Sequence, residues 1–421
     1  MKKLPAPSRR NFLQGAALAA SGFLPADSAA AEPNHPAPID APRDLKPTGA
    51  DLGSLFADVD RLAGPAAYEY SFLGDRFRNL EDFRKTAREK VFDLLLHRPP
   101  KVEPRAEVLE RVDRGDHVRE KVVFSTTPQF RVPAYVLLPK GLKKKAPAIV
   151  DLHSHGGMFL YGKEKVIDLG DNHAVLTDYH QRNYDGRPTA TELVRRGYVV
   201  LTIDAFMFGE RRAVLDADVK YGWDRSRYSA DDMRYLNQQC RGKESTIAKA
   251  LILAGLTWPG IVCWDDIRSV DYLITRPEVD SARIGCLGIS MGGYRSCYLA
   301  ALDERIRAAC VTGFMSTVRP MMKAHVDTHS WIHFLPGLHR FLDLPDVAAL
   351  HAPQALLVQQ CSQDRLFPPE GMKESVEKIA AVYEKAGMKD RFTARFYDVP
   401  HKFTKPMQEE AFDWFDRQLK G

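Results

Sequence analysis

One short segment, residues 283–294, limits the possible fold more than any other part of the chain. It reads Arg-Ile-Gly-Cys-Leu-Gly-Ile-Ser-Met-Gly-Gly-Tyr, an apolar run typical of a buried strand and then a Gly-x-Ser-x-Gly turn at 288–292. A serine on a sharp turn between a strand and a helix presents its hydroxyl above the sheet edge, and the flanking glycines leave room for the turn. The segment therefore predicts a strand–turn–helix unit with Ser290 as a nucleophile.

A serine nucleophile needs a base, and the base needs an acid that orients it. In hydrolases built around such a turn, the chain order is serine, then the acid, then histidine. The strand-like run 355–360 leads into a loop that carries Asp364. We predict Asp364 as the acid, because ligand sites of parallel sheets lie past the carboxyl ends of their strands. Asp390 and Asp398 are weaker alternatives.

His401 is the predicted base. It follows the strand-like run 393–399 and precedes an amphipathic stretch at 407–419, which places it in the loop between the last strand and the last helix. Asp398 lies too close to His401 in sequence to fit the usual order. The expected reaction is acyl transfer from an ester to Ser290, followed by hydrolysis of the acyl-enzyme.

The expected oxyanion hole combines two backbone amides. The first is the N–H of Met291, which directly follows the serine. A second buried strand, 146–152, runs into His-Ser-His-Gly-Gly-Met at 153–158. We predict that the Gly157 N–H is the second donor, with Met158 as the alternative, because glycine lets the backbone approach a carbonyl closely.

The same segment permits a competing interpretation. Asp151, His153 and His155 alternate at the strand end, and a His-x-His pair can bind a divalent metal. No later set of histidines and acids matches it, so the sequence favours no metal. We expect His155 to order the loop, and His153 either to do the same or to face the substrate.

From about residue 145 to 419 the chain resembles the acetylxylan esterase-like and dienelactone hydrolase-like branch of the α/β-hydrolases. The resemblance rests on His-Gly-Gly at 155–157, Asp-Ala-Phe-Met-Phe-Gly-Glu-Arg at 204–211, Trp-Asp-Asp-Ile-Arg-Ser-Val-Asp-Tyr-Leu at 264–273, Arg-Pro-Glu-Val-Asp at 276–280, the serine motif at 288–294, Asp364 and His401. It implies a carboxylic ester hydrolase without a cofactor, often one that deacetylates sugars. The chain departs from many relatives at Cys361-Ser362-Gln363-Asp364, where they carry a glycine.

Two other functions stay open. The serine motif is also similar to that of prolyl oligopeptidase-type serine peptidases, which would require an acidic pair to bind a free amine. About 110 residues separate the signal region from the strand at 146–152, too few for a multi-blade propeller. The third function is that of a binding protein that has kept the fold and lost activity, which the intact triad order opposes.

Alternating strand and helix patterns over about 250 residues predict an α/β fold, with a mostly parallel sheet covered by helices on both faces. The run 107–139 predicts antiparallel strands that lead into it, and 52–96 looks helical. Loops at the carboxyl edge of the sheet normally build the substrate site. We expect three insertions there, at 161–185, 211–255 and 314–347.

Several side chains are candidates to contact the substrate. The first candidates are His153, Trp258, Tyr294 and Arg295, and Trp223, Trp331 and His329 are further ones. Aromatic faces suit sugar rings, but an aromatic side chain more often packs in a core. Arg295 either contacts a polar substrate or pairs with a carboxylate such as Asp265.

The first residues predict export. A charged start with Arg9-Arg10-Asn11-Phe12-Leu13, an apolar run at 15–24 and small residues up to Ala31 resemble a twin-arginine signal peptide. The run is too short to span a membrane. We therefore divide the chain into a signal at 1–31, a linker at 32–50, a helical segment at 51–100 and a hydrolase domain at 101–421, and expect a periplasmic or extracellular protein.

The net charge and the cysteine spacing argue against several classes of protein. The formal charge is +5, of which residues 1–31 carry +3, so the remaining chain is near +2 and gives no argument for nucleic acid. The six cysteines show neither zinc-site spacing nor a dense disulfide framework, although one bridge stays open. The sequence carries no signal of oligomeric state.

Overall fold

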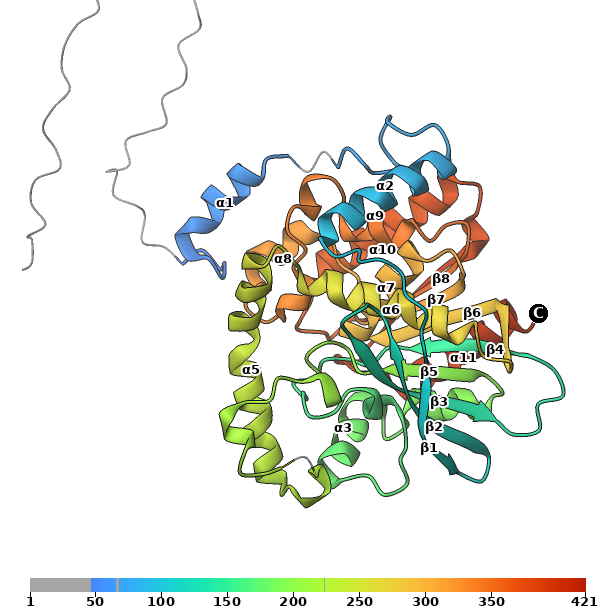
Figure 1. Ribbon diagram of the computed structural model, residues 1–421. Helices are drawn as coiled ribbons and strands as arrows, with labels where there is room; N and C mark the ends of the chain where they lie inside the picture. Colours follow the sequence, from blue (N-terminus) through green and yellow to red (C-terminus); the bar gives the residue numbers. More distant parts are fainter. Residues whose placement is uncertain (1–46, 66–67, 223) are drawn as a thin grey trace, which may run out of the picture. The chain divides into compact units, whose positions relative to one another are not determined.

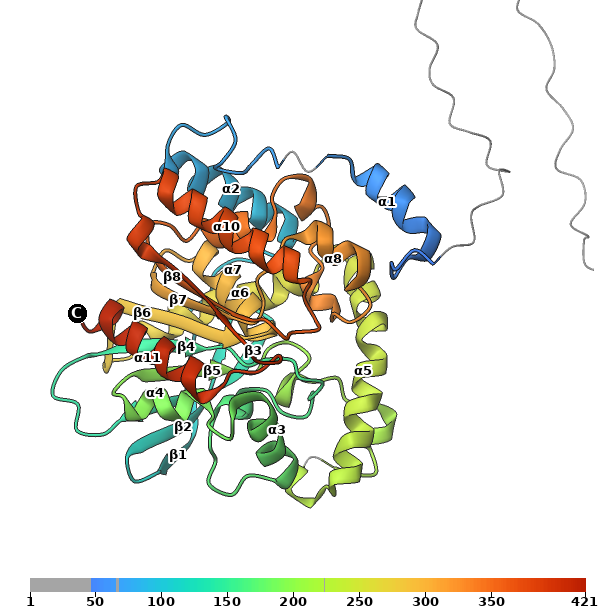
Figure 2. The same cartoon turned by 180° about the vertical axis from the view of Figure 1, so that it is seen from behind.

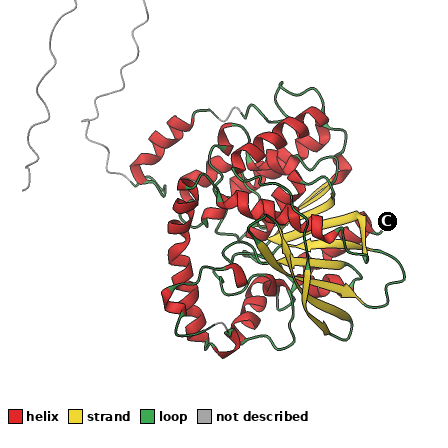
Figure 3. Ribbon diagram, in the orientation of Figure 1, coloured by secondary structure: helices red, strands yellow, loops and turns green. Residues whose placement is uncertain are grey.

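In the part of the chain that the structure describes, nine strands form one sheet at the centre of the fold (Figures 1 and 3). The structure is a computed structural model that describes residues 47–421 except 66–67 and 223. The predicted signal and most of the predicted linker lie outside the described residues, as does Trp223. Residues 48–421 belong to one compact unit.

The strands follow the order β1-β2-β3-β5-β4-β6-β7-β8-β9. Neighbours from β1 to β5 in this order are antiparallel, and those from β5 to β9 are parallel. The mostly parallel sheet and its antiparallel leading strands are therefore as predicted. The bounds are β1 Glu107–Asp113, β2 His117–Ser125, β3 Arg131–Pro139, β4 Ala146–Asp151, β5 Val199–Ile203, β6 Val279–Ile289, β7 Ile306–Thr312, β8 Ala355–Cys361 and β9 Phe392–Tyr397.

Helices cover both faces of the sheet (Figures 1 and 2). The α-helices are α1 Phe56–Ala63, α2 Leu80–Leu95, α3 Ala174–Tyr184, α4 Thr189–Arg195, α5 Ala230–Leu253, α6 Trp258–Leu273, α7 Met291–Leu302, α8 Val318–Ala324, α9 Leu344–Ala349, α10 Pro369–Lys385 and α11 Lys405–Leu419. Short 3-10 turns are η1 Gly53–Leu55, η2 Lys163–Val166, η3 Gly209–Arg211, η4 Asp216–Asp218, η5 Arg225–Arg227, η6 Trp331–His333, η7 Leu338–Arg340 and η8 Lys389–Arg391.

Side-chain alternation along the strands builds two cores. In β8, Leu356 and Val358 join the core under α2, α6, α7, α9 and α10, while Leu357 points into the core under α3, α4 and α11. Successive residues of a strand point to opposite faces, so a strand that is apolar throughout must be covered on both sides. This explains why the parallel strands read as continuous apolar runs.

The helical prediction for residues 52–96 was only partly right. Two helices occupy its ends, α1 and α2, and the described residues between them are not helical. Gly64, with φ of 70°, ends α1 in a conformation that favours glycine. Asn79 begins α2, and its side chain accepts a hydrogen bond from the Asp82 N–H at 2.9 Å.

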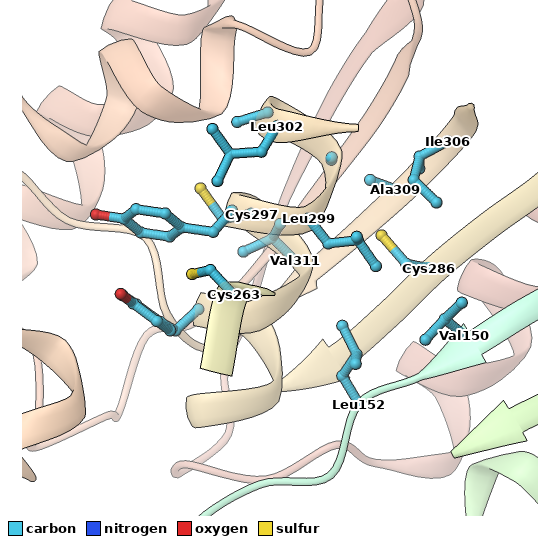
Figure 4. Close-up of a cluster of buried hydrophobic side chains, with 14 of the residues drawn as sticks. Val150, Leu152, Cys263, Cys286, Cys297, Leu299, Leu302, Ile306, Ala309 and Val311 are labelled. Carbon is cyan, nitrogen blue, oxygen red and sulfur yellow. The ribbon is translucent and has the colours of Figure 1, made fainter. Parts of the chain in front are cut away.

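All six cysteines are buried free thiols, so the disulfide that the sequence left open is not present. Cys263, Cys286 and Cys297 pack with Leu299 and Val311 between α6, α7 and the central strands (Figure 4). Burial raises the pKa of the Cys263 and Cys286 thiols well above the usual value. These cysteines act as small apolar core residues.

No single helix within 47–65, 68–222 and 224–421 is long and apolar enough to cross a membrane; only the bent pair α5 and α6, taken together, passes by length and composition.

Candidate active site

The turn after β6 gives Ser290 an unusual backbone. Its φ and ψ are 61° and −122°, and the residue directly precedes α7. A non-glycine residue in this region is strained and persists only where its surroundings hold it, which is common at functional sites. Its N–H donates to the Thr312 carbonyl at 2.9 Å, and its own carbonyl accepts from the Tyr294 N–H at 2.8 Å.

The two glycines of the motif are required by the strand next to the turn. A Cβ atom on Gly288 or on Gly292 would lie well inside the van der Waals distance of the Leu152 carbonyl oxygen at the end of β4. The backbones of β4, β6 and α7 therefore approach one another without side chains between them. This contact fixes the height at which Ser290 stands above the sheet.

Asp364 and His401 are hydrogen-bonded to each other. His401 Nδ1 lies 2.5 Å from Asp364 Oδ2, and Asp364 Oδ1 accepts from the Leu366 N–H at 2.9 Å. An ionised carboxylate can only accept, so Nδ1 carries the proton and Nε2 keeps its lone pair. This tautomer is the one that a general base requires. Asp398, by contrast, is exposed and accepts from the Gln363 amide at 2.9 Å.

Ser290 and His401 line the same cavity, whose volume is about 350 Å³. No hydrogen bond joins the two side chains in the described part of the chain, and triad contacts are often loose before substrate binds. All three predicted insertions contribute to the wall. The lining is Ser154, His155, Gly156, Gly157, Asn183, Arg241, Glu244, Ser245, Ile289, Ser290, Asp327, Thr328, His329, Ser330, Trp331, His333, Leu366 and His401.

The loop after β4 is held in a tight conformation. Gly156 and Gly157 both have positive φ, 54° and 67°. The Gly157 N–H donates to His155 Nδ1 at 3.0 Å, and the Met158 N–H donates to the His155 carbonyl at 3.2 Å. Both amides proposed as the second oxyanion donor thus already have partners within the loop. The partner of Gly157 is a side-chain nitrogen, whereas that of Met158 is a backbone carbonyl.

The second ring nitrogen of His155, Nε2, is held by Glu244 of α5. Because Nδ1 accepts from Gly157, the proton is on Nε2, which donates to Glu244 Oε1 at 3.0 Å. The same oxygen accepts from Ser330 Oγ at 2.6 Å. Glu244 is only 9 % exposed, and burial alone would raise its pKa, but the hydrogen bonds from His155 and Ser330 hold the pKa below the usual range. The expectation that His155 orders the loop agrees with these contacts.

A buried lysine, Lys165, also holds the loop after β4 through hydrogen bonds to its backbone. Lys165 Nζ donates to the carbonyls of Ser154 and His155 at 2.9 and 3.0 Å, and stands 4.3 Å from the Phe208 ring centroid. Its complete burial lowers the pKa of this amine well below the usual value. The loop is thus held by hydrogen bonds on both sides.

Of the two roles expected for His153, the structure contradicts contact with the substrate and agrees with ordering of the loop. The side chain is fully buried and does not line the cavity. Its Nε2 accepts from the Ala205 N–H at 3.2 Å, so Nδ1 carries the proton and donates to the Ser154 carbonyl at 3.0 Å. Asp151 accepts from Thr189 Oγ1 at 2.6 Å. Among the described residues, no three His, Cys, Asp or Glu side chains are arranged to hold a metal ion.

The substrate contacts predicted for Trp258, Tyr294 and Arg295 were also wrong, because all three side chains are buried and none lines the cavity. Trp258 begins α6 within the core, and Tyr294 packs against the Tyr298 ring at 4.5 Å between centroids. Arg295 does pair with a carboxylate, but with Asp266 rather than Asp265, through contacts of 2.6 and 3.0 Å. Asp265 instead accepts from Arg211 at 2.7 Å.

His329 and Trp331, the further aromatic candidates, do line the cavity. His333 lines it as well and was not predicted, although it stands only four residues after His329 in the chain. The centroids of these two imidazole rings are 5.3 Å apart. Burial lowers the pKa of both, so these histidines are neutral donors or acceptors in the cavity wall.

The strand order, the strained serine turn and the order Ser, Asp, His along the chain define the α/β-hydrolase fold. The chain belongs to the abhydrolase family, whose sequence model, described as "Abhydrolase family", matches residues 64–417. It is 27% identical over 339 residues to YtaP of Bacillus subtilis (strain 168), a protein provisionally named a hydrolase. That match covers 80% of this chain and 100% of YtaP.

Two solved structures with the same fold are named as esterases. A Bacteroides fragilis protein provisionally named an acetyl xylan esterase gives a TM-score of 0.62 at 18% identity, covering 82% of this chain and 83% of its own. The glucuronoyl esterase of Solibacter usitatus gives 0.57 at 16% identity, covering 84% and 97%. At these identities the likeness establishes the fold.

Proposed function

We propose that this chain is a serine carboxylic ester hydrolase that works through an acyl-enzyme. The observation that carries the proposal is the set of groups around one cavity: a strained serine at a helix start, a histidine held by a buried aspartate, and a glycine loop facing both. Each has a defined role in acyl transfer. Membership of the abhydrolase family supports the same class of reaction.

In the proposed mechanism, Ser290 Oγ attacks the ester carbonyl while His401 Nε2 takes the serine proton. The Asp364 carboxylate keeps the imidazole in the required tautomer and stabilises the imidazolium. The tetrahedral intermediate collapses, the C–O bond to the alcohol breaks, and His401 returns the proton to the leaving alcohol. Water then repeats the sequence on the acyl-enzyme and releases the acid and free Ser290.

We propose that the Met291 N–H and the Gly157 N–H stabilise the oxyanion. Met291 occupies the first position of α7, where an N–H has no partner within the helix and the helix dipole favours negative charge. Gly157 lines the cavity, and its present acceptor is the His155 side chain. A charged oxyanion is the stronger acceptor, so we expect it to take over or share this N–H.

For the substrate we propose an esterified carbohydrate, with an acetyl group as the favoured acyl part. The cavity wall carries imidazoles, hydroxyls and an indole, from His329, His333, Ser330 and Trp331 among others, which can bind sugar hydroxyls and stack on sugar rings. Structures with the same fold are named for acetyl xylan and glucuronoyl ester cleavage. The twin-arginine pattern at Arg9-Arg10 supports export, and the reaction needs no cofactor.

A serine exopeptidase is the second candidate, and one observation favours it. Glu244 and Asp327 both line the cavity, so two carboxylates are present where a free amine could bind. Glu244 Oε1, however, already accepts hydrogen bonds from His155 and Ser330. The esterase proposal needs no such pair, which is why we favour it.

The test compares three substrates with the wild-type protein and with Ser290→Ala: p-nitrophenyl acetate, acetylated xylo-oligosaccharide and an aminoacyl p-nitroanilide. We expect hydrolysis of both esters, little cleavage of the anilide, and a loss of about 10⁴-fold or more in kcat for the variant. Preferential anilide cleavage would favour the exopeptidase. Retained turnover by Ser290→Ala would overturn the proposed nucleophile.

A further inference from the structure

A second hollow adjoins the cavity on the far side of the glycine loop. It lies between α3 and the first half of α5 and has a volume of about 720 Å³. It shares Gly156, Gly157 and Arg241 with the active-site cavity, so the two are continuous around the loop. We call this hollow the arginine groove, because Arg182, Arg234 and Arg241 line it. Its size suffices for a sugar unit.

The three arginines come from two helices that face each other. Arg234 and Arg241 are seven residues apart on α5, which puts them on the same side of the helix two turns apart. Arg182 is in the last turn of α3. Asp178 is the acid that lines the groove, and it accepts from Arg182 at 2.8 Å. Cationic groups therefore outnumber acids in the lining.

The existing ion pairs in the groove are weak. Arg182 with Asp178 and Arg234 with Asp231 are pairs of exposed side chains, 58–86 % accessible, and such pairs contribute little in water. Arg241 makes no ion pair or hydrogen bond within the described ranges, although its charge acts on Glu244 and helps to lower the pKa of that carboxyl. Glu244, the nearest acid on the same helix face, is engaged through Oε1 by His155 and Ser330. Asp327 lines the cavity but not the groove.

We infer that the arginine groove binds a carboxylate on the alcohol portion of the substrate, with Arg241 as its main partner. This rests on the proposed esterase function. A guanidinium presents paired N–H donors that match a carboxylate, and Arg241 stands where groove and cavity meet. The substrate class is then an acidic oligosaccharide ester: the ester lies at Ser290, and a uronate unit of the same chain lies in the groove.

The experiment compares kcat/KM for an acetylated oligogalacturonide, which carries carboxylates, with that for an acetylated xylo-oligosaccharide, which carries none. The proteins are the wild type, Arg241→Gln and Lys243→Gln. Lys243 is an exposed cation two residues along α5 that lines neither hollow, so it controls for the loss of one charge. Hydrolysis of p-nitrophenyl acetate reports the chemistry without a sugar chain.

We expect the wild type to favour the acidic substrate by about tenfold, since charge-assisted hydrogen bonds are the strong ones. Arg241→Gln should remove this preference, Lys243→Gln should keep it, and 0.5 M salt should reduce it by screening. No preference in the wild type, or a preference that survives in Arg241→Gln, would overturn the inference while p-nitrophenyl acetate is still hydrolysed. If the wild type hydrolyses none of the three esters, the result would instead count against the proposed esterase function.

Discussion

Glu244 Oε1 lies 3.0 Å from His155 Nε2, and this bond links the α5 insertion to the loop that carries Gly157. The two residues are 89 positions apart in the chain. Through His155, the carboxylate fixes which ring nitrogen faces the Gly157 amide. A residue far from Ser290 in sequence thus sets the geometry of the proposed oxyanion loop.

Glu244→Leu is expected to lower stability and kcat together. The substitution leaves the His155 Nε2–H and the Ser330 hydroxyl without their acceptor, and such a loss costs about 1–3 kcal/mol. Glu244→Gln keeps an acceptor oxygen and should retain most of both. Thermal unfolding and p-nitrophenyl acetate hydrolysis measure the two effects, and equal behaviour of the Leu and Gln variants would refute the role of the hydrogen bond.

The same carboxylate gives a pH-dependent contribution to stability. Its pKa is lower in the folded protein than the usual 4.5, so the folded state binds fewer protons than the unfolded state near that pH. The contribution is complete above the ordinary value and is lost as the pH falls through the folded pKa. Urea unfolding should show a small difference in stability between wild type and Glu244→Gln near neutral pH, and this difference should shrink as the pH falls below about 4.5. A difference independent of pH would contradict this.

Asp364→Asn should lower kcat by about 10³–10⁴-fold with little change in fold, because the neutral amide allows the wrong imidazole tautomer. Asp398→Asn is the matched control. This aspartate lies in the His401 loop and is exposed, and among the described residues its side chain bonds to Ser362 and Gln363 alone. Steady-state kinetics on p-nitrophenyl acetate distinguishes them, and a comparable loss in both variants would remove Asp364 from the triad.

Gly292→Ala should damage both the turn and the reaction. The added Cβ would overlap the Leu152 carbonyl oxygen, a backbone atom that cannot move aside as a side chain can. Such overpacking costs about 1–3 kcal/mol. A displacement of Ser290 by about 1 Å can cost about 10²-fold in rate. Gly242→Ala on α5, where a Cβ meets nothing within 4 Å, should instead be neutral or stabilising by up to about 1 kcal/mol. Calorimetry and kinetics on both variants check this pair.

Arg295→Met should destabilise the protein by about 3–5 kcal/mol, because it leaves Asp266 buried without a partner. If the folded variant is assayed below its melting temperature, KM for p-nitrophenyl acetate should stay close to that of the wild type. A raised KM with unchanged stability would restore the original interpretation of Arg295 as a substrate contact.

The order of Ser290, Asp364 and His401 could be predicted because each lies just past a strand, and parallel strands bring their carboxyl ends to one edge. The three insertions around the cavity follow from the same rule. The need for glycine on both sides of Ser290 could also be predicted, because this type of turn brings the backbone close to a neighbouring strand, here at Leu152.

The substrate contacts could not be predicted in this way. Tyr294 and Arg295 stand beside the serine in sequence, but α7 is buried along its whole length, so both side chains face core. The bond between His155 and Glu244 joins segments whose packing is set by tertiary structure. The hydrogen bond from the Gly157 N–H to His155 could not be predicted either, because the sequence does not indicate which rotamer His155 adopts.

The most direct test of the central claim is the site of covalent labelling. The protein is incubated with a fluorophosphonate probe and digested, and the modified peptide is located by mass spectrometry, in parallel with p-nitrophenyl acetate turnover. The account predicts a single label on Ser290, loss of turnover in proportion to labelling, and no label in Ser290→Ala. Turnover that continues in a fully labelled protein, or a label on another residue that abolishes activity, would contradict it.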